Sequence, residues 1–305
     1  MIHDIIKKKY PTTSLVKLEG GYTNNTVLLE GIKPPLVAKI YSEHGNAASE
    51  VAALTILNDL NIAPRVHEYF EHDSTSCLIM DYLPGSVGQR FLDCGDMPKT
   101  RDMYRQLGTI LAEHVHFVCV DAAAELPMLE LVHSNMDSFV PADLLDEVRR
   151  ALDVGFTDVV SLVHGDFGPQ NIIVYQTEAK ATDNAKITDD AKTTAYAKII
   201  DETRTIDNIK IVDWEFAGWG NPLFDIAWVV WFVHLHYPRI CKEMSAIFLR
   251  EYRTHSDICI DKKLLKAFAV SRVVFILGLI SMDNVPGRTE WIRRLTWTLG
   301  VDFMG

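Results

Sequence analysis

Apolar and polar positions alternate in short runs along roughly the first ninety residues, a pattern typical of β-strands with one buried face. Turns rich in glycine or proline, such as Gly20-Gly21 and Pro34-Pro35, separate the runs. The runs that predict strands are residues 16–19, 26–30, 36–41, 66–70 and 76–80. Over residues 47–60 the apolar residues instead recur every three or four positions, which predicts a helix.

Beyond residue 84 the spacing of apolar residues becomes mainly helical. The stretches with this spacing are residues 101–118, residues 142–151 and most of the chain from Pro222 onward. Two short apolar runs, residues 171–175 and 209–212, interrupt the helical region and predict a hairpin of two strands.

Together these patterns predict an α+β chain with two lobes. The small antiparallel-sheet lobe covers residues 1–82 and the larger, mostly helical lobe covers residues 83–305. A chain that joins two lobes near Pro84 and Gly85 leaves a cleft between them, which is a common place for a ligand.

A repeat-containing insertion, residues 176–208, separates the two strands of the predicted hairpin. It contains the units AKATD, AKITD, AKTTA and AKIID at a step of six residues. This step is not a helical period, and four short copies are too few for a β-solenoid, so we expect an expanded surface loop. A flap that contacts the substrate or a partner chain is the alternative.

The composition narrows the class of protein. Hydrophobic residues make up 48% of the 305 residues, which permits a sizeable core, and the net charge of −11 argues against a nucleic-acid partner. The same charge is compatible with a cationic small substrate, although an acidic surface that keeps a protein soluble explains it more simply. The five cysteines are scattered without a CxxC pair, which indicates a reducing, cytoplasmic location and no zinc site or disulfide framework.

The sequence also predicts no membrane partner. The first residues lack the apolar stretch of a signal peptide. The longest apolar runs, residues 223–235 and 270–282, are shorter than a membrane span and contain Asp225 and Arg272. We therefore expect both runs to be buried helices.

The predicted hairpin has polar residues before its first strand and after its second strand, and their side chains could share a ligand. In the segment HGDFGPQNIIV, Asp166 and Asn171 lie on either side of a short loop that leads into the first strand. Asp213 follows the second strand, and paired strands bring their ends close together. Oxygen ligands of this kind suit Mg²⁺ together with phosphate oxygens and water, whereas zinc prefers histidine and cysteine.

The segments HGDFGPQNIIV and IVDWEFAG resemble the catalytic and metal-binding segments of the aminoglycoside phosphotransferase family, which are small-molecule kinases with a protein-kinase-like fold. Gly165 replaces the arginine of the protein-kinase pattern and Trp214 follows the metal aspartate, as in this family. The continuation GWGNPLFDIAWVVWF is also similar, and Asp225 matches the family's buried acid. The resemblance implies a bilobal protein-kinase-like fold that transfers the γ-phosphoryl of ATP or GTP to a hydroxyl group.

The resemblance also implies roles for the residues of the larger lobe. Asp166 would accept the proton of the acceptor hydroxyl or orient that hydroxyl, and His164 would brace the loop by hydrogen bonds. Asn171 and Asp213 would hold Mg²⁺ on the phosphates. Asp225 would stabilise the catalytic loop, although an acid at a helix N-terminus is an equally good interpretation.

In the smaller lobe the resemblance assigns residues to the nucleotide. Gly20, Gly21 and Asn24 match the loop that covers the phosphates, although a plain β-hairpin explains these residues as well. Lys39 stands in an apolar strand, where a lysine is costly unless it is paired, and Glu50 on the following helix is the expected partner. Lys39 would contact the α- and β-phosphates and Glu50 would orient it; a purely structural ion pair is the alternative.

The resemblance also implies that the adenine base of the nucleotide binds at the linker between the lobes. By the resemblance, Met80 would back the adenine, and the Asp81 carbonyl and the Leu83 amide would bind its edge. A turn at the end of a strand is the plain interpretation of the same residues. For the acceptor, Glu215 and Trp219 are the candidate contacts.

Three functions remain open at this stage. The first is a kinase for aminoglycosides or a related hydroxylated antibiotic, and the second is a metabolic kinase for choline, an amino alcohol or a sugar. The third is a nucleotide-binding pseudokinase that regulates a partner, against which the presence of Lys39, Asp166, Asn171 and Asp213 argues. The sequence leaves the acceptor and the choice between monomer and dimer open.

Overall fold

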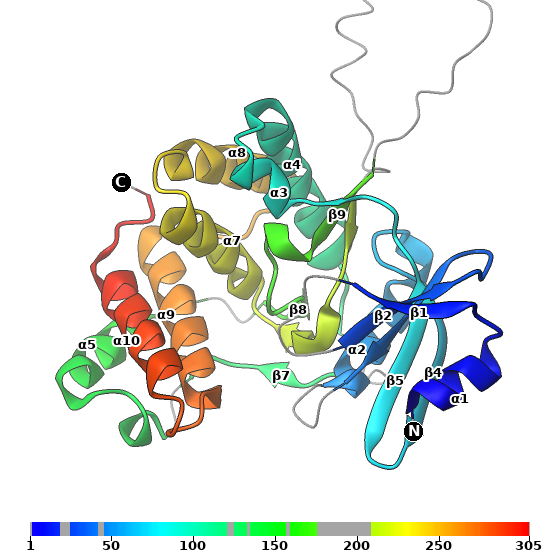
Figure 1. Ribbon diagram of the computed structural model, residues 1–305. Coiled ribbons are helices and arrows are strands. Elements are labelled where there is room, and N and C mark those ends of the chain that lie inside the picture. Colours follow the sequence, from blue (N-terminus) through cyan, green and yellow to red (C-terminus); the bar gives the residue numbers. More distant parts are fainter. Residues whose placement is uncertain are drawn as a thin grey trace, which may run out of the picture.

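The computed structural model describes residues 2–18, 25–41, 46–120, 125–132, 135–156, 159–175 and 209–304. Its N-terminal region contains an antiparallel sheet of five strands in the order β1-β2-β3-β5-β4 (Figure 1). The elements of this region are α1 (Ile2–Lys9), β1 (Ser14–Lys17), β2 (Asn25–Glu30), β3 (Leu36–Ile40), α2 (Ala47–Ile56), a 3₁₀ turn at Asn58–Leu60, β4 (Val66–His72) and β5 (Thr75–Asp81).

Strand β3 occupies the centre of this sheet and is buried along its whole length. Ala38 shares a small apolar cluster with Ile6 of α1, whereas Val37 belongs to the main core together with Leu54 of α2. Because side chains alternate between the two faces of a strand, Lys39 projects from the same face as Val37. The alternation therefore directs Lys39 toward α2 rather than toward α1.

The C-terminal region is mostly helical, with two small sheets in the orders β10-β9-β6 and β7-β11-β8 (Figure 1). Its helices are α3 (Gln89–Asp93), α4 (Met97–Ile110), α5 (Ala142–Leu152), α7 (Leu223–His236), α8 (Cys241–His255), α9 (Lys262–Leu279) and α10 (Val285–Gly300). Its strands are β6 (Ser86–Val87), β7 (Met128–Leu129), β8 (Ser161–Val163), β9 (Ile172–Val174), β10 (Ile209–Ile211) and β11 (Gly218–Gly220).

Helix α7 runs through the middle of the helical region. It packs against α8 and α9, and its residues are apolar on most faces and mostly buried. Among the described residues no helix is both long enough and apolar enough to cross a membrane.

Helices α4 and α8 approach each other closely at Gly108. A Cβ at this position would lie 2.8 Å from the backbone oxygen of Phe248 and 2.9 Å from the Cβ of Glu251. Only a residue without a side chain allows the two backbones to come this close.

The predicted α+β class, with an antiparallel sheet followed by a helical region, is confirmed. The ends of some elements differ from the prediction. Helix α4 begins at Met97 instead of Arg101, because the Asp96 side chain accepts a hydrogen bond from Lys99 N at 3.2 Å and caps the helix. The predicted surface loop at residues 176–208 lies outside the described residues, and the lobe boundary at residue 82 stays a prediction.

Candidate active site

The loop between β8 and β9 has a backbone that only glycine permits at one point. Gly165 has φ +79°, and a Cβ there would lie 2.2 Å from the backbone oxygen of Phe216. Asp225, in the first turn of α7, accepts hydrogen bonds from the backbone N–H groups of His164 at 2.8 Å and Gly165 at 2.9 Å. The first turn of α7 therefore fixes the loop that presents Asp166.

Asp225 is itself held from a second side. His116, which follows a π-helical turn at Leu111–Val115, places Nε2 3.2 Å from the Asp225 carboxylate. The other ring nitrogen of His116 lies 2.9 Å from the hydroxyl of Tyr252 on α8. The sequence gives no sign of this role, because the partners of His116 lie more than a hundred positions away along the chain.

His164 uses both ring nitrogens inside the protein. The backbone N–H of Asp166 donates to Nδ1 at 3.2 Å, so Nε2 carries the proton and donates to the backbone oxygen of Val212 at 3.0 Å. The ring is fully buried and packs against Trp214 with centroids 4.5 Å apart. His164 thus braces the loop from behind and has no free nitrogen in this arrangement.

The two carboxylate oxygens of Asp166 have different partners. Oδ1 accepts a hydrogen bond from Trp228 Nε1 at 2.9 Å and lies 3.5 Å from a terminal guanidinium nitrogen of Arg272. Oδ2 accepts from the side-chain amide of Asn171 at 3.0 Å. Burial raises the pKa of Asp166, and the nearby Arg272 guanidinium group opposes that rise.

A second cluster of charges connects the sheet with the helical region. Lys39 Nζ lies 2.5 Å from Glu50 Oε2 and also forms an ion pair with Asp213 Oδ1. The Glu50 carboxylate accepts further hydrogen bonds from the Tyr41 hydroxyl at 2.8 Å and from Trp214 N at 3.3 Å. Burial alone would lower the pKa of Lys39, but the Glu50 and Asp213 carboxylates outweigh it and raise the pKa.

Asn171 and Asp213 flank the same end of a strand pair. Strands β9 and β10 form an antiparallel hairpin in which Ile172 lies opposite Ile211. The backbone N–H of Val212 donates to the backbone oxygen of Asn171 at 2.9 Å. Asp213 has a left-handed backbone with φ +67°, and its side chain is 36% exposed.

These two side chains fit Mg²⁺. The Asn171 amide nitrogen is committed to Asp166, which leaves its oxygen without a partner among the described residues. Lys39 engages one oxygen of the exposed Asp213 carboxylate. Two protein oxygens suit a hard cation that takes its other ligands from phosphate and water. No group of three histidine, cysteine, aspartate or glutamate side chains within the described ranges is arranged to hold a metal ion.

The predicted residues of the linker lie where the sheet meets the helical region. Met80 is buried in the main core. The backbone N–H of Asp81 donates to the backbone oxygen of Arg65 at 3.1 Å. The backbone N–H of Leu83 makes no hydrogen bond to a described residue, so it stays available to a ligand.

The structure does not place some of the predicted ligand contacts beside Asp166 or Lys39. Gly20, Gly21 and Asn24 lie outside the described residues. Glu215 and Trp219, the candidate acceptor contacts, are each only 3% exposed. Sequence reasoning did not find Trp228 and Arg272, the donors to Oδ1 of Asp166, because both stand in apolar helices that look like plain core.

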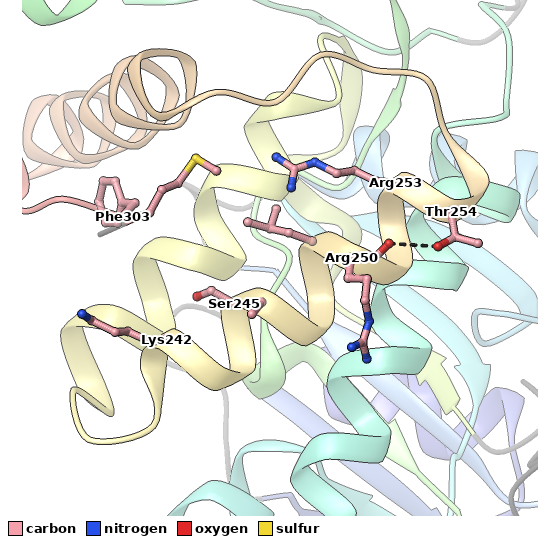
Figure 2. Close-up of a pocket in the computed structure, with 9 residues that line it drawn as sticks. Lys242, Ser245, Arg250, Arg253, Thr254 and Phe303 are labelled. Atoms are coloured by element: carbon pink, nitrogen blue, oxygen red, sulfur yellow. Dashed lines mark hydrogen bonds between the residues drawn. The ribbon is translucent and has the colours of Figure 1, made fainter.

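A cavity of about 420 Å³ lies elsewhere, between α8 and the C-terminal residues (Figure 2). Its lining includes Lys242, Ser245, Arg253 and Phe303. None of the residues around Asp166 or Lys39 lines it, so we do not assign it to the same site.

The antiparallel sheet, the helical region and the charged residues where they meet define a kinase-like phosphotransferase. A family model described as "Phosphotransferase enzyme family" matches residues 14–181, more than half of the chain. The protein belongs to this family, which confirms the resemblance seen in its motifs. No curated protein matches the chain.

Solved structures confirm the kinase-like fold. A choline/ethanolamine kinase family protein from Mesorhizobium loti is 18% identical with a TM-score of 0.63, and the match covers 100% of this chain and 97% of that one. An aminoglycoside-3'-phosphotransferase of type VIII is 17% identical with a TM-score of 0.60, covering 90% and 97%. A thermostable mutant of aminoglycoside phosphotransferase APH(4)-Ia, in a ternary complex with AMP-PNP and hygromycin B, is 15% identical with a TM-score of 0.61, covering 98% and 97%.

Proposed function

We propose that this protein transfers the γ-phosphoryl group of ATP, or of GTP, to a hydroxyl group of a small molecule. The proposal rests on two clusters of side chains, one around Lys39 and one around Asp166. Lys39 is held by Glu50 and Asp213, and Asp166 is held by Asn171 and Trp228. The family membership and the AMP-PNP bound to a structural relative support it.

The N-terminal region supplies the nucleotide site in this proposal. Lys39 binds the α- and β-phosphates while Glu50 keeps its ammonium group in place. The base lies against Met80 and uses the free N–H of Leu83 and the carbonyl of Asp81. Gly20, Gly21 and Asn24 remain the predicted cover of the phosphates.

Asp166 orients the acceptor hydroxyl and takes its proton. Oδ1 already has two donors, Trp228 and Arg272, whereas Oδ2 has one, so the hydroxyl approaches Oδ2. His164 keeps the loop in position without transferring a proton. Catalysis of this kind depends mainly on placing the reactants and on balancing charge.

Asn171 and Asp213 hold Mg²⁺ together with the phosphates. The ion, when bound, neutralises charge on the transferred phosphoryl group. Lys39 restrains Asp213, and Asp166 restrains the amide nitrogen of Asn171, which leaves the amide oxygen for the ion.

Two acceptor classes follow from the relatives, namely small amino alcohols and antibiotics, and sugars form a third. A screen of purified protein with Mg·ATP or Mg·GTP against these classes, with product detection by mass spectrometry, identifies the acceptor. Nucleotide binding without phosphorylation of any acceptor would favour the pseudokinase alternative. The five free cysteines support the proposed cytoplasmic location.

The Asp166→Ala variant tests the assignment of the base. We expect kcat to fall by about 10²- to 10⁴-fold, the usual effect of removing a positioned base, while Mg·ATP still binds. Near-normal turnover would remove Asp166 from this role.

A further inference from the structure

Arg272 is an unusual residue beside the catalytic carboxylate, because its guanidinium group is surrounded by aromatic rings. Its central carbon lies 4.6 Å from the ring centroid of Phe216, 5.2 Å from that of Phe275 and 5.6 Å from that of Trp228. The rings come from three places: the 3₁₀ turn Trp214–Phe216, α9 and α7. We call these three rings the ring enclosure.

The guanidinium group is buried but has few hydrogen-bond partners. Arg272 is 9% exposed, and its contact with Asp166 Oδ1 is long, at 3.5 Å. Its Nε has no partner among the described residues. A guanidinium group has five N–H donors, and leaving such donors unpaired in a buried place costs stability. The lack of hydrogen-bond acceptors around the Arg272 guanidinium group indicates that a ligand supplies oxygen acceptors to it.

One ring of the enclosure and the Asp166 carboxylate are both in contact with solvent. Phe275 is 38% exposed, and the Asp166 side chain is 24% exposed. A molecule whose hydroxyl meets Oδ2 of Asp166 therefore lies close to the guanidinium group, since Arg272 is 3.5 Å from the other oxygen of the same carboxylate.

We propose, building on the phosphotransferase function above, that Arg272 selects the acceptor. The acceptor presents a carboxylate or an uncharged oxygen group next to the phosphorylated hydroxyl, and a cationic nitrogen is excluded from that position. Aromatic rings arranged around a space commonly bind quaternary ammonium groups, but in this protein Arg272 fills that space with its own cation. A cationic group would meet like charge there, whereas a carboxylate can accept two parallel hydrogen bonds from the guanidinium fork.

Three acceptors that share a three-carbon skeleton test the wild-type protein. Glycerate carries a carboxylate, glycerol an uncharged hydroxyl and 3-amino-1,2-propanediol a protonated amine next to the same hydroxyl. We expect kcat/KM for glycerate to exceed that for the amine by about tenfold or more. A preference for the amine would overturn the proposal.

Variants of Arg272 separate selection from a structural role. Arg272→Met should lower the ratio of kcat/KM for glycerate over the amine by about 10- to 100-fold, mainly through KM for glycerate. Arg272→Lys keeps the charge and should keep the order of preference. Arg250→Met, which removes an exposed arginine of α8, is the matched control and should leave the ratio unchanged. An equal loss on both acceptors in Arg272→Met would mean that Arg272 only supports the structure.

A binding measurement covers the case in which the three-carbon acceptors are too small to react. Tetramethylammonium probes the ring enclosure directly by calorimetry. We expect no binding to the wild type and binding to Arg272→Ala, in which the space is emptied. Binding to the wild type, or no binding to an Arg272→Ala variant that melts as a folded protein, would overturn the proposal.

The experiments distinguish a failure of the role given to Arg272 from a failure of the proposed phosphotransferase function. If the wild type does not bind Mg·ATP and phosphorylates nothing in the wider screen, the phosphotransferase proposal fails. If it phosphorylates acceptors but prefers a cation beside the hydroxyl, only the role of Arg272 fails.

Discussion

At the scale of single residues, Lys39 is a buried cation whose position depends on two carboxylates. It is 5% exposed, and Glu50, its partner in the core, is fully buried. Removing one member of a buried pair leaves an uncompensated charge, which costs far more than an exposed ion pair would.

Lys39→Met should therefore lower the free energy of unfolding by about 3 kcal/mol, measured by urea denaturation. It should also weaken Mg·ATP binding by about tenfold or more, measured by calorimetry. The double variant Lys39→Met/Glu50→Gln leaves no unpaired charge in the core, since Asp213 is partly exposed, and it should regain part of the stability but none of the affinity. Full recovery of nucleotide binding in the double variant would show that Lys39 is only structural.

Trp228 offers a second test at the same scale. Trp228→Phe keeps an aromatic side chain but removes the hydrogen bond to Asp166, so we expect kcat to fall about tenfold with little change in nucleotide affinity. Trp231→Phe is the matched control, because its indole N–H donates to Thr298 in the core and should affect stability instead. An equal loss of kcat in both variants would contradict the role given to Trp228.

Residues close together in sequence were the easiest to find. Asp166 and Asn171 are five positions apart, and one hairpin carries Asp213 to the same place, so the motif alone predicts their proximity. Trp228 and Arg272 reach Asp166 from 62 and 106 positions away. No local pattern distinguishes them from other residues of apolar helices, and only the packing of α7 and α9 brings them to the carboxylate.

At the scale of elements, the close approach of α4 and α8 depends on Gly108. Gly108→Ala should destabilise the protein by about 1–3 kcal/mol in thermal or urea unfolding, because the added methyl group has backbone atoms on one side and cannot be accommodated by a rotamer change. Gly155→Ala is the control, since a Cβ there meets nothing within 4 Å. A Gly108→Ala variant as stable as the control would mean that the two helices can separate without cost.

The periodicity of apolar residues predicted most elements of both regions, because burial on one face leaves a clear pattern. It did not predict α1, whose single fully buried residue is Ile6, or the three-stranded sheet β7-β11-β8. Strands of two or three residues are too short to show any period. The starts of α2 and α5 were predicted correctly, at Ala47 and Ala142, whereas the start of α4 was placed too late because side-chain capping by Asp96 sets it rather than apolar spacing.

At the scale of the whole molecule, nucleotide binding should couple the two regions. A ligand that binds only the folded state at 100 times its Kd adds about 2.7 kcal/mol of stability. We expect Mg·ATP to raise Tm, and ATP without Mg²⁺ to raise it less. Asp213→Ala should remove the contribution of Mg²⁺, and an unchanged response of Tm in this variant would count against the metal assignment.

Acid should destabilise the whole protein through His234. Burial lowers the pKa of His234, and nearby Lys242 adds to this effect. The folded state therefore binds fewer protons, so the stability that neutral His234 provides is complete above about pH 6.5 and is lost as the pH falls below it. His234→Phe should reduce the fall of Tm between about pH 7 and 5, whereas exposed His72→Gln should not. Identical pH profiles for wild type and His234→Phe would exclude this cause.

The pairing of β9 with β10 has a practical consequence. Val174, the last residue of β9, lies opposite Ile209, the first residue of β10, so the two strands are paired up to the ends that flank residues 175–208. Cutting the chain there would give one fragment with Lys39, Asp166 and Asn171 and another with Asp213. Neither half alone could turn over nucleotide, so phosphorylation would report reassembly, and two proteins fused to the halves could be assayed for their association.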